Sequence, residues 1–70
     1  MSEREMIKSW VVMTSAVTNP TKNIWSASVT ILGYDENGMG ASIERAYNDL
    51  VDILVANEGY RFYIIEKLNK

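Results

Sequence analysis

Carboxylate side chains are the first candidates for chemistry in this chain of 70 residues. Asp49 and Asp52 stand three positions apart, and Glu44 and the pair Asp35-Glu36 lie nearby in the sequence. Paired carboxylates can act in general acid–base catalysis or hold Mg²⁺. Charged side chains also cover the solvated surface of ordinary small domains. We therefore interpret this group as an acidic surface and predict no metal site.

Histidine and cysteine do not occur in the sequence. Histidine is the side chain that most often transfers protons near neutral pH, and a serine or threonine nucleophile needs such a base. Without cysteine there is neither a disulfide framework nor a thiolate metal site. We therefore expect a protein that is not an enzyme and that uses no cofactor.

A glycine-rich stretch, Gly38-Met39-Gly40, precedes a segment with helical periodicity. Backbone amides at the start of a helix can bind an anion. The lysine of a P-loop and the third glycine of a dinucleotide-binding motif are both missing. We interpret the stretch as a loop in which the chain turns into the helix.

Aromatic residues are the remaining candidates, because aromatic side chains on a sheet can stack on nucleobases. Lys8, Arg61 and Lys67 share the alternation of Trp10 and Tyr63, so they would lie among these rings. The formal charge of −2 argues against binding a long nucleic acid, which needs a cationic surplus. Two alternatives stay open: a small nucleotide-like ligand held between protomers by Lys8 and Arg61, or a sheet that binds single-stranded nucleic acid.

Turn residues divide the chain into four segments that would position these side chains. Residues 6–17 are rich in β-branched side chains. Residues 24–34 alternate between apolar and polar side chains, which would place Trp25, Ala27, Val29 and Ile31 on the core face. Both patterns are typical of strands. The polar stretch 18–23, which contains Pro20, would join them in a β-hairpin, and residues 35–40 would form a second break.

The second half of the chain predicts a helix and a strand. Residues 41–57 repeat apolar side chains with helical spacing, and Ser42 is a suitable N-cap. Residues 60–68 alternate as a strand does, which would place Tyr60, Phe62 and Ile64 on the core face. The sequence thus predicts an α+β fold of order β-β-α-β, a three-stranded, mainly antiparallel sheet in the order 2-1-3 with one helix packed on one face. Residues 1–5 would be a polar tail and residues 6–70 a single domain.

An apolar surplus remains on the sheet face opposite the helix. Its members would be Trp10, Val12, Leu32, Tyr34, Tyr63 and Ile65. A different strand register or ordinary scattered surface residues would explain them, but a contiguous patch of this size is typical of an interface. We predict that binding residues are Trp10, Val12, Leu32, Tyr63 and Ile65, with Glu44 and Tyr47 on the helix as a second patch. A twofold homodimer is the simplest assembly.

The predicted layout resembles several small phage-encoded proteins built as a β-hairpin, a helix and a final strand. These include dimeric inhibitors of host uracil-DNA glycosylase and an antitoxin that blocks a host RNase. Glu44 and Tyr47 match the glutamate and tyrosine of the aromatic-Glu-x-x-Tyr run of the glycosylase inhibitors. The resemblance implies a viral protein that inhibits a host protein.

The expected function is therefore protein binding without catalysis, by a homo-oligomeric module that inhibits another protein. A purely structural subunit of an oligomer is a further alternative. No apolar run approaches the roughly 18 residues of a membrane span, and the polar start of the chain is not a signal peptide. We expect a cytoplasmic protein that has no membrane partner.

Overall fold

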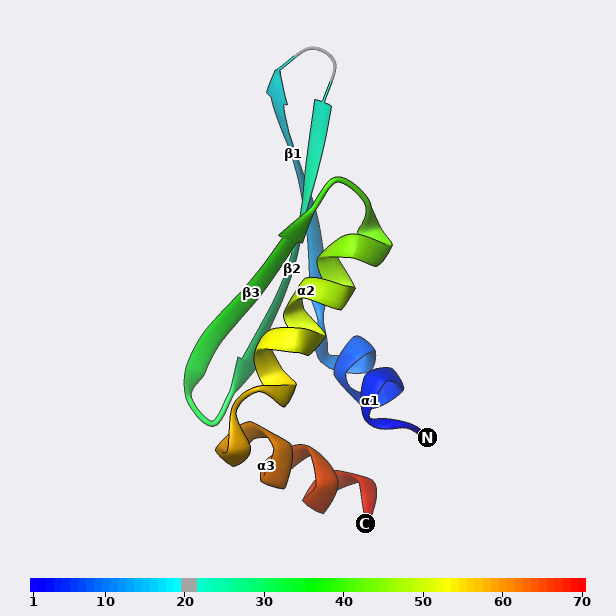
Figure 1. Cartoon of the computed structure of the whole chain (residues 1–70), viewed down its shortest axis with the longest axis vertical. Coiled ribbons are helices and arrows are strands. Elements are labelled where there is room, and N and C mark those ends of the chain that lie inside the picture. Colours follow the sequence, from blue (N-terminus) through cyan, green and yellow to red (C-terminus); the bar gives the residue numbers. More distant parts are fainter. Residues whose placement is uncertain (20–21) are drawn as a thin grey trace.

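The fold has the element order α-β-β-β-α-α over the residues that the structure describes. The computed structural model describes residues 1–19 and 22–70, and the side chains of residues 1–15 and 23–70. The elements are α1 (Glu3–Trp10), β1 (Val12–Asn19), β2 (Lys22–Ile31), β3 (Tyr34–Gly40), α2 (Ile43–Val55) and α3 (Glu58–Leu68). Helix α2 lies along the sheet, while α1 and α3 lie at one end of it (Figure 1).

The three strands form one antiparallel sheet in the order β1-β2-β3. The predicted α+β class and the three-stranded antiparallel sheet are therefore confirmed. The predicted β-β-α-β order with a single helix is wrong, and so is the strand order 2-1-3. The predicted position of Pro20 in a loop lies outside the described residues.

Residues 6–17, for which the sequence predicts one strand, belong to two different elements. Helix α1 occupies the first part of this segment, and β1 begins only at Val12. The helix starts within the stretch expected as a polar tail, because the Ser2 hydroxyl accepts a hydrogen bond from the Glu5 amide at 3.1 Å. A side-chain acceptor at this position satisfies an otherwise unpaired amide of the first turn. The buried side chain of Ile7 then anchors α1 to the core.

Residues 24–40, predicted as one strand followed by a loop, form two paired strands. The chain turns at Leu32 and Gly33, where both residues have positive φ angles of 52° and 81°. Positive φ at both central residues is what a two-residue hairpin of type I′ requires. The residues that follow, predicted as a loop, form β3 and pair with β2 from Ile31–Tyr34 to Trp25–Gly40.

The glycines of β3 allow α2 to pack directly on the strand. A Cβ atom added at Gly38 would overlap the Leu50 amide nitrogen, and one at Gly40 would lie 2.6 Å from the Arg45 Cβ. The predicted helix of residues 41–57 is confirmed as α2, and its predicted N-cap Ser42 accepts a hydrogen bond from the Arg45 amide. The glycine stretch is therefore a packing surface for a helix rather than a loop.

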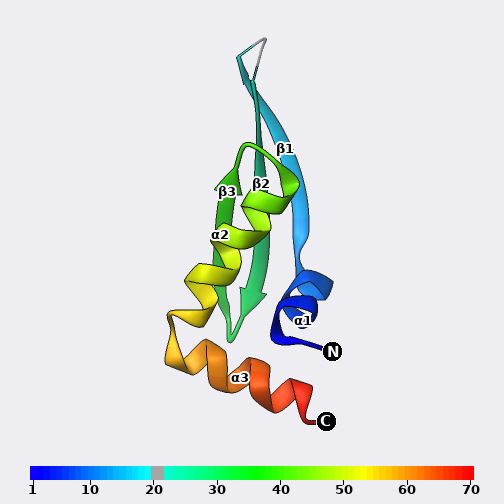
Figure 2. The same cartoon turned by 45° about the vertical axis from the view of Figure 1, so that its right-hand side comes forward.

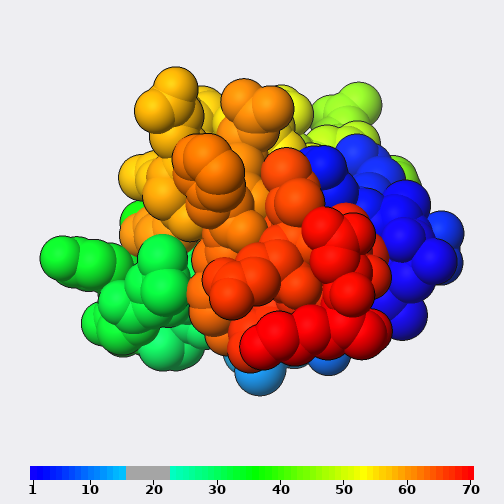
Figure 3. Space-filling view, turned by 90° about the horizontal axis from the view of Figure 1, so that it is seen from below, coloured from blue at the N-terminus to red at the C-terminus, as the bar shows by residue number. Residues whose placement is uncertain are grey.

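Residues 60–68, predicted as a strand, belong to helix α3. The core lies between α2 and the inner face of the sheet and is closed at one end by α1 and α3. Its buried residues are Ile7, Ala27, Val29, Ile31, Ala46, Leu50, Val51, Leu54, Tyr60 and Ile64. The view from below shows α3 running across this end of the molecule beside α1 (Figure 3).

Candidate functional site

The residues predicted to share an open sheet face are distributed over four elements. Trp10 ends α1, Leu32 lies in the β2–β3 turn, and Tyr63 and Ile65 belong to α3. Val12 alone of the five predicted anchors lies on a strand, with 64% of its surface exposed. The prediction of a single apolar patch on the sheet is therefore wrong, because the segments that carry Trp10, Tyr63 and Ile65 are helical.

Two of the predicted anchors do lie together. The rings of Trp10 and Tyr63 are 5.8 Å apart between centroids and tilted by 57°, which is a favourable aromatic geometry. The Lys67 ammonium lies 5.2 Å from the centroid of the Tyr63 ring. Trp10 and Tyr63 are both half-buried. This pair joins α1 to α3, so its first role is to hold the two helices together.

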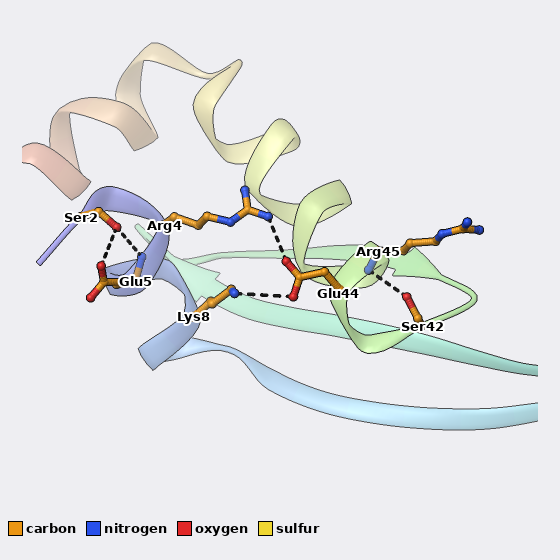
Figure 4. A network of polar contacts seen from close by, with 7 residues as sticks. All are labelled: Ser2, Arg4, Glu5, Lys8, Ser42, Glu44 and Arg45. Atoms are coloured by element: carbon orange, nitrogen blue, oxygen red, sulfur yellow. Dashed lines mark hydrogen bonds and ion pairs between the residues drawn. The ribbon is translucent and has the colours of Figure 1, made fainter.

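Glu44 and Tyr47 also lie where the sequence suggested, on one surface of α2 facing α1. The Glu44 carboxylate is 3.5 Å from the Arg4 guanidinium and 3.7 Å from the Lys8 ammonium (Figure 4). Lys8 also lies 5.1 Å from the centroid of the Tyr47 ring. Lys8, predicted as a ligand-binding cation, is therefore paired with a carboxylate of its own chain. Because these groups are largely exposed, each ion pair contributes little to stability.

A groove of about 540 Å³ lies on the sheet face opposite α2. Trp10 and Val12 line it together with polar residues of β2 and β3, namely Ser28, Thr30, Asp35 and Asn37. The Thr30 hydroxyl donates a hydrogen bond of 2.6 Å to the Asp35 carboxylate. The acidic lining opposes a phosphate group, so this groove does not fit the nucleotide alternative.

The outer surface of α3 carries exposed apolar residues that the sequence pattern predicts on the two faces of a strand. Phe62, placed in the core by strand alternation, is 74% exposed, and Ile65 is 39% exposed. Together with Glu58 and Arg61 they line a shallow hollow of about 410 Å³. We name these four residues the α3 outer surface. These residues come together only once the segment is a helix, because positions 58, 61, 62 and 65 share one side of a helix.

The inner side of α3 is fixed to the sheet by a polar contact. The Tyr60 hydroxyl donates a hydrogen bond of 2.7 Å to the Glu36 carboxylate of β3. This bond, with burial of the ring and the nearby negative charge, raises the pKa of Tyr60 to about 12. Asn57 caps the helix by accepting from the Tyr60 amide at 3.1 Å. With Tyr60 held inward, Phe62 lies on the opposite, outer side of α3.

The carboxylates considered for acid–base or metal chemistry do not gather into one site among the described residues. Asp49 accepts a hydrogen bond of 2.9 Å from the Met39 amide, and Asp52 is exposed to solvent. Within residues 1–19 and 22–70, no group of three carboxylates lies close enough to hold a metal ion. In the same described ranges, none of the helices has the length and apolar character needed to cross a membrane.

Comparisons with known proteins add no further assignment. Protein families, curated proteins and solved structures were all compared with this chain, and none of them matches it significantly.

Proposed function

We propose that this chain is a non-catalytic protein-binding module that binds its partner through the α3 outer surface. The observation that supports this is the large exposure of Phe62 on a helix whose other side is buried through Tyr60 and Ile64. A surface helix of a small domain usually has one apolar side. Covering an exposed phenylalanine contributes about 1.5–3 kcal/mol, which a partner would gain on binding.

The chemistry around Phe62 favours a protein over a nucleotide. Aromatic and arginine side chains are the most frequent energetic centres of protein interfaces, and Arg61 lies next to Phe62 in the same hollow. Glu58 also lines this hollow, and its carboxylate would repel a phosphate. An apolar centre with one cation and one anion at its border matches the usual anatomy of a protein interface.

Inhibition of the bound protein is part of the proposal. A domain that covers a partner's surface blocks access to that surface, so binding itself is the inhibitory act. The α-β-β-β-α-α order differs from the hairpin-helix-strand layout of the phage inhibitors. The proposal therefore rests on the α3 outer surface alone and not on that likeness.

A capture experiment with matched variants tests the proposal. Tagged wild-type protein, Phe62→Ala and Tyr34→Ala are each incubated with lysate from the cells of origin, and the bound proteins are quantified. Tyr34 is the matched control because it is an aromatic residue of similar exposure, 66%, in β3. Loss of an interface centre of about 2 kcal/mol weakens binding about 30-fold. We expect this loss for Phe62→Ala only, and equal capture by all three proteins would contradict the proposal.

A further inference from the structure

The two edges of the sheet differ in how well their backbone groups are covered. At the β3 edge, α2 packs against Gly38. The Met39 amide there already donates a hydrogen bond of 2.9 Å to the Asp49 carboxylate. The strand also carries the charges of Asp35 and Glu36. Charged residues and a covering helix are the features with which natural proteins prevent another strand from adding to an edge. The β3 edge is therefore closed to a further strand.

The β1 edge lacks these protective features. Its eight residues, Val12–Asn19, include no charged residue, no proline and no glycine. Helix α2 packs on β3 and β2 rather than on β1. Figure 2 shows β1 along the outer border of the sheet, and none of the described helices or strands lies beside its outer side above α1. Apart from a register shift between Val17 and Asn19, its backbone offers a regular row of donors and acceptors.

Strands β1 and β2 also extend past the end of β3. The last residue of β3, Gly40, pairs with Trp25, whose partner in β1 is Ser15. Beyond this point the ribbon has only two strands, which form the projection at the top of Figure 1. A two-stranded ribbon is marginally stable in water and gains from a third strand. The part of the sheet that most needs another strand thus borders its unprotected edge.

We infer that a second copy of this chain pairs along β1, antiparallel and about a twofold axis perpendicular to the sheet. The result is a six-stranded sheet in which both α2 helices lie on the same face. A second copy fits because β1 is uncharged, so the self-pair brings no like charges together. With the twofold axis close to Thr14, the Thr14 side chains of the two copies would lie near each other. Helix α2 lies over the other two strands and leaves room at β1.

This inference extends the proposed function and does not depend on it. The α3 outer surface lies at the other end of the molecule from the projecting ribbon (Figure 1). The dimer therefore leaves Phe62 of both copies free to bind a partner. A variant that disrupts pairing at the β1 edge can therefore leave partner binding at the α3 outer surface intact, and the reverse also holds.

Light scattering coupled to size-exclusion chromatography gives the first test, over a series of protein concentrations. We expect the wild type and Asn37→Lys to have twice the chain mass of 7.9 kDa. Thr14→Lys, and separately Thr14→Glu, should fall to one chain mass, because like charges then meet across the twofold axis. Mixing these two variants should restore the dimer. Asn37 is the matched control because it is exposed on the same sheet face but belongs to the β3 edge.

Spin labels give a second measurement that does not depend on disrupting the dimer. The sequence has no cysteine, so Thr14→Cys and Asn37→Cys each carry a single label. Labels at position 14 should couple strongly, whereas those at position 37 should be about five strand spacings, or about 24 Å, apart. A wild-type monomer at every concentration would overturn the inference. So would a dimer that persists in Thr14→Lys, or one that dissociates equally in Asn37→Lys or in Phe62→Ala.

Discussion

The Tyr60 hydroxyl of α3 donates a 2.7 Å hydrogen bond to the Glu36 carboxylate of β3, residues that are 24 positions apart in the chain. This contact, with the buried Tyr60 ring and the buried Ile64, fixes which side of α3 faces the sheet. It thereby also fixes which side faces solvent. The exposure of Phe62 and Ile65 follows from the orientation that Tyr60 imposes.

Removing this hydroxyl should lower stability and change its pH dependence. The pKa of Tyr60 is about 12 in the fold, whereas an exposed tyrosine has a pKa of 10.0. The neutral hydroxyl is the donor in this bond. Its contribution to the free energy of unfolding is therefore complete below pH 10 and is lost as the pH rises towards 12. We expect Tyr60→Phe to unfold at lower urea concentration than the wild type at neutral pH. The difference between the two proteins should shrink above pH 10, and a constant difference would contradict this assignment.

The close packing of α2 on β3 predicts a large effect of a single methyl group. In Gly38→Ala, the new Cβ would overlap the Leu50 amide nitrogen and lie 2.8 Å from the Ala46 carbonyl oxygen. A backbone shift of the helix is then required, and we expect a loss of about 3 kcal/mol in the free energy of unfolding. Gly59→Ala is the control, because its nearest neighbour is a side-chain atom at 3.3 Å and its effect should stay within about 1 kcal/mol. Urea unfolding measures both, and equal effects would be inconsistent with direct helix packing at Gly38.

The sequence predicts the fold most accurately where local pattern and tertiary packing agree. Alternation places Trp25, Ala27, Val29 and Ile31 on the core face of β2; the last three are buried, and Trp25 is partly buried against them. Helical spacing identifies α2, because its apolar residues have one dominant side that contacts the sheet. These elements show the same period in sequence and in structure.

Helix α3 resembles a strand in sequence for a physical reason. Apart from Arg61, residues 60–65 are apolar or aromatic on both sides of the helix, since α3 buries Tyr60 and Ile64 while exposing Phe62 and Ile65. Such a segment has no clear helical period, and its β-branched residues favour a strand interpretation. The capping residues carried the missing signal. Ser2 and Glu5 have the spacing of a capping box, and Asn57 is the N-cap of α3.

The candidate surface depends on α3, so the sequence pattern predicts only part of it. Ile65 belongs to the predicted interface, whereas alternation assigns Phe62 to the core. The assignment of a helix reverses the position of Phe62, because residues 60 and 62 share one side of a strand but lie on nearly opposite sides of a helix. The turn at Leu32 was hidden for another reason, since leucine rarely adopts a positive φ angle.

The unusual backbone of Leu32 predicts a stabilising substitution. Its φ angle of 52° is in the left-handed region, which costs a residue with an ordinary side chain about 1–2 kcal/mol. Asparagine tolerates this region well, and the exposed leucine side chain loses little burial when replaced. We expect Leu32→Asn to raise the free energy of unfolding by about 1 kcal/mol. Leu32→Ala should give no such gain, because alanine lacks the short polar side chain with which asparagine stabilises the left-handed conformation. A loss of stability in Leu32→Asn would show that the leucine side chain has a structural role.

The ion pairs of Glu44 predict a small and salt-dependent effect. Glu44→Gln removes the attraction to Arg4 and Lys8 while retaining the side-chain shape. We expect a loss of less than about 1 kcal/mol at low salt, because these groups are largely exposed. The difference from wild type should disappear at high salt, where exposed charges are screened. A larger loss that salt leaves unchanged would indicate a buried role for Glu44, contrary to its exposure.

Photo-crosslinking from position 62 tests the central claim most directly. A photoreactive phenylalanine analogue is incorporated at Phe62 or, in a matched protein, at Tyr34, which is exposed to a similar extent in β3. Both proteins are irradiated in the cells of origin. We expect a defined adduct with another protein from position 62 and none from position 34. Adducts of equal yield from both positions, or none from position 62, would contradict the proposal that the α3 outer surface binds a partner.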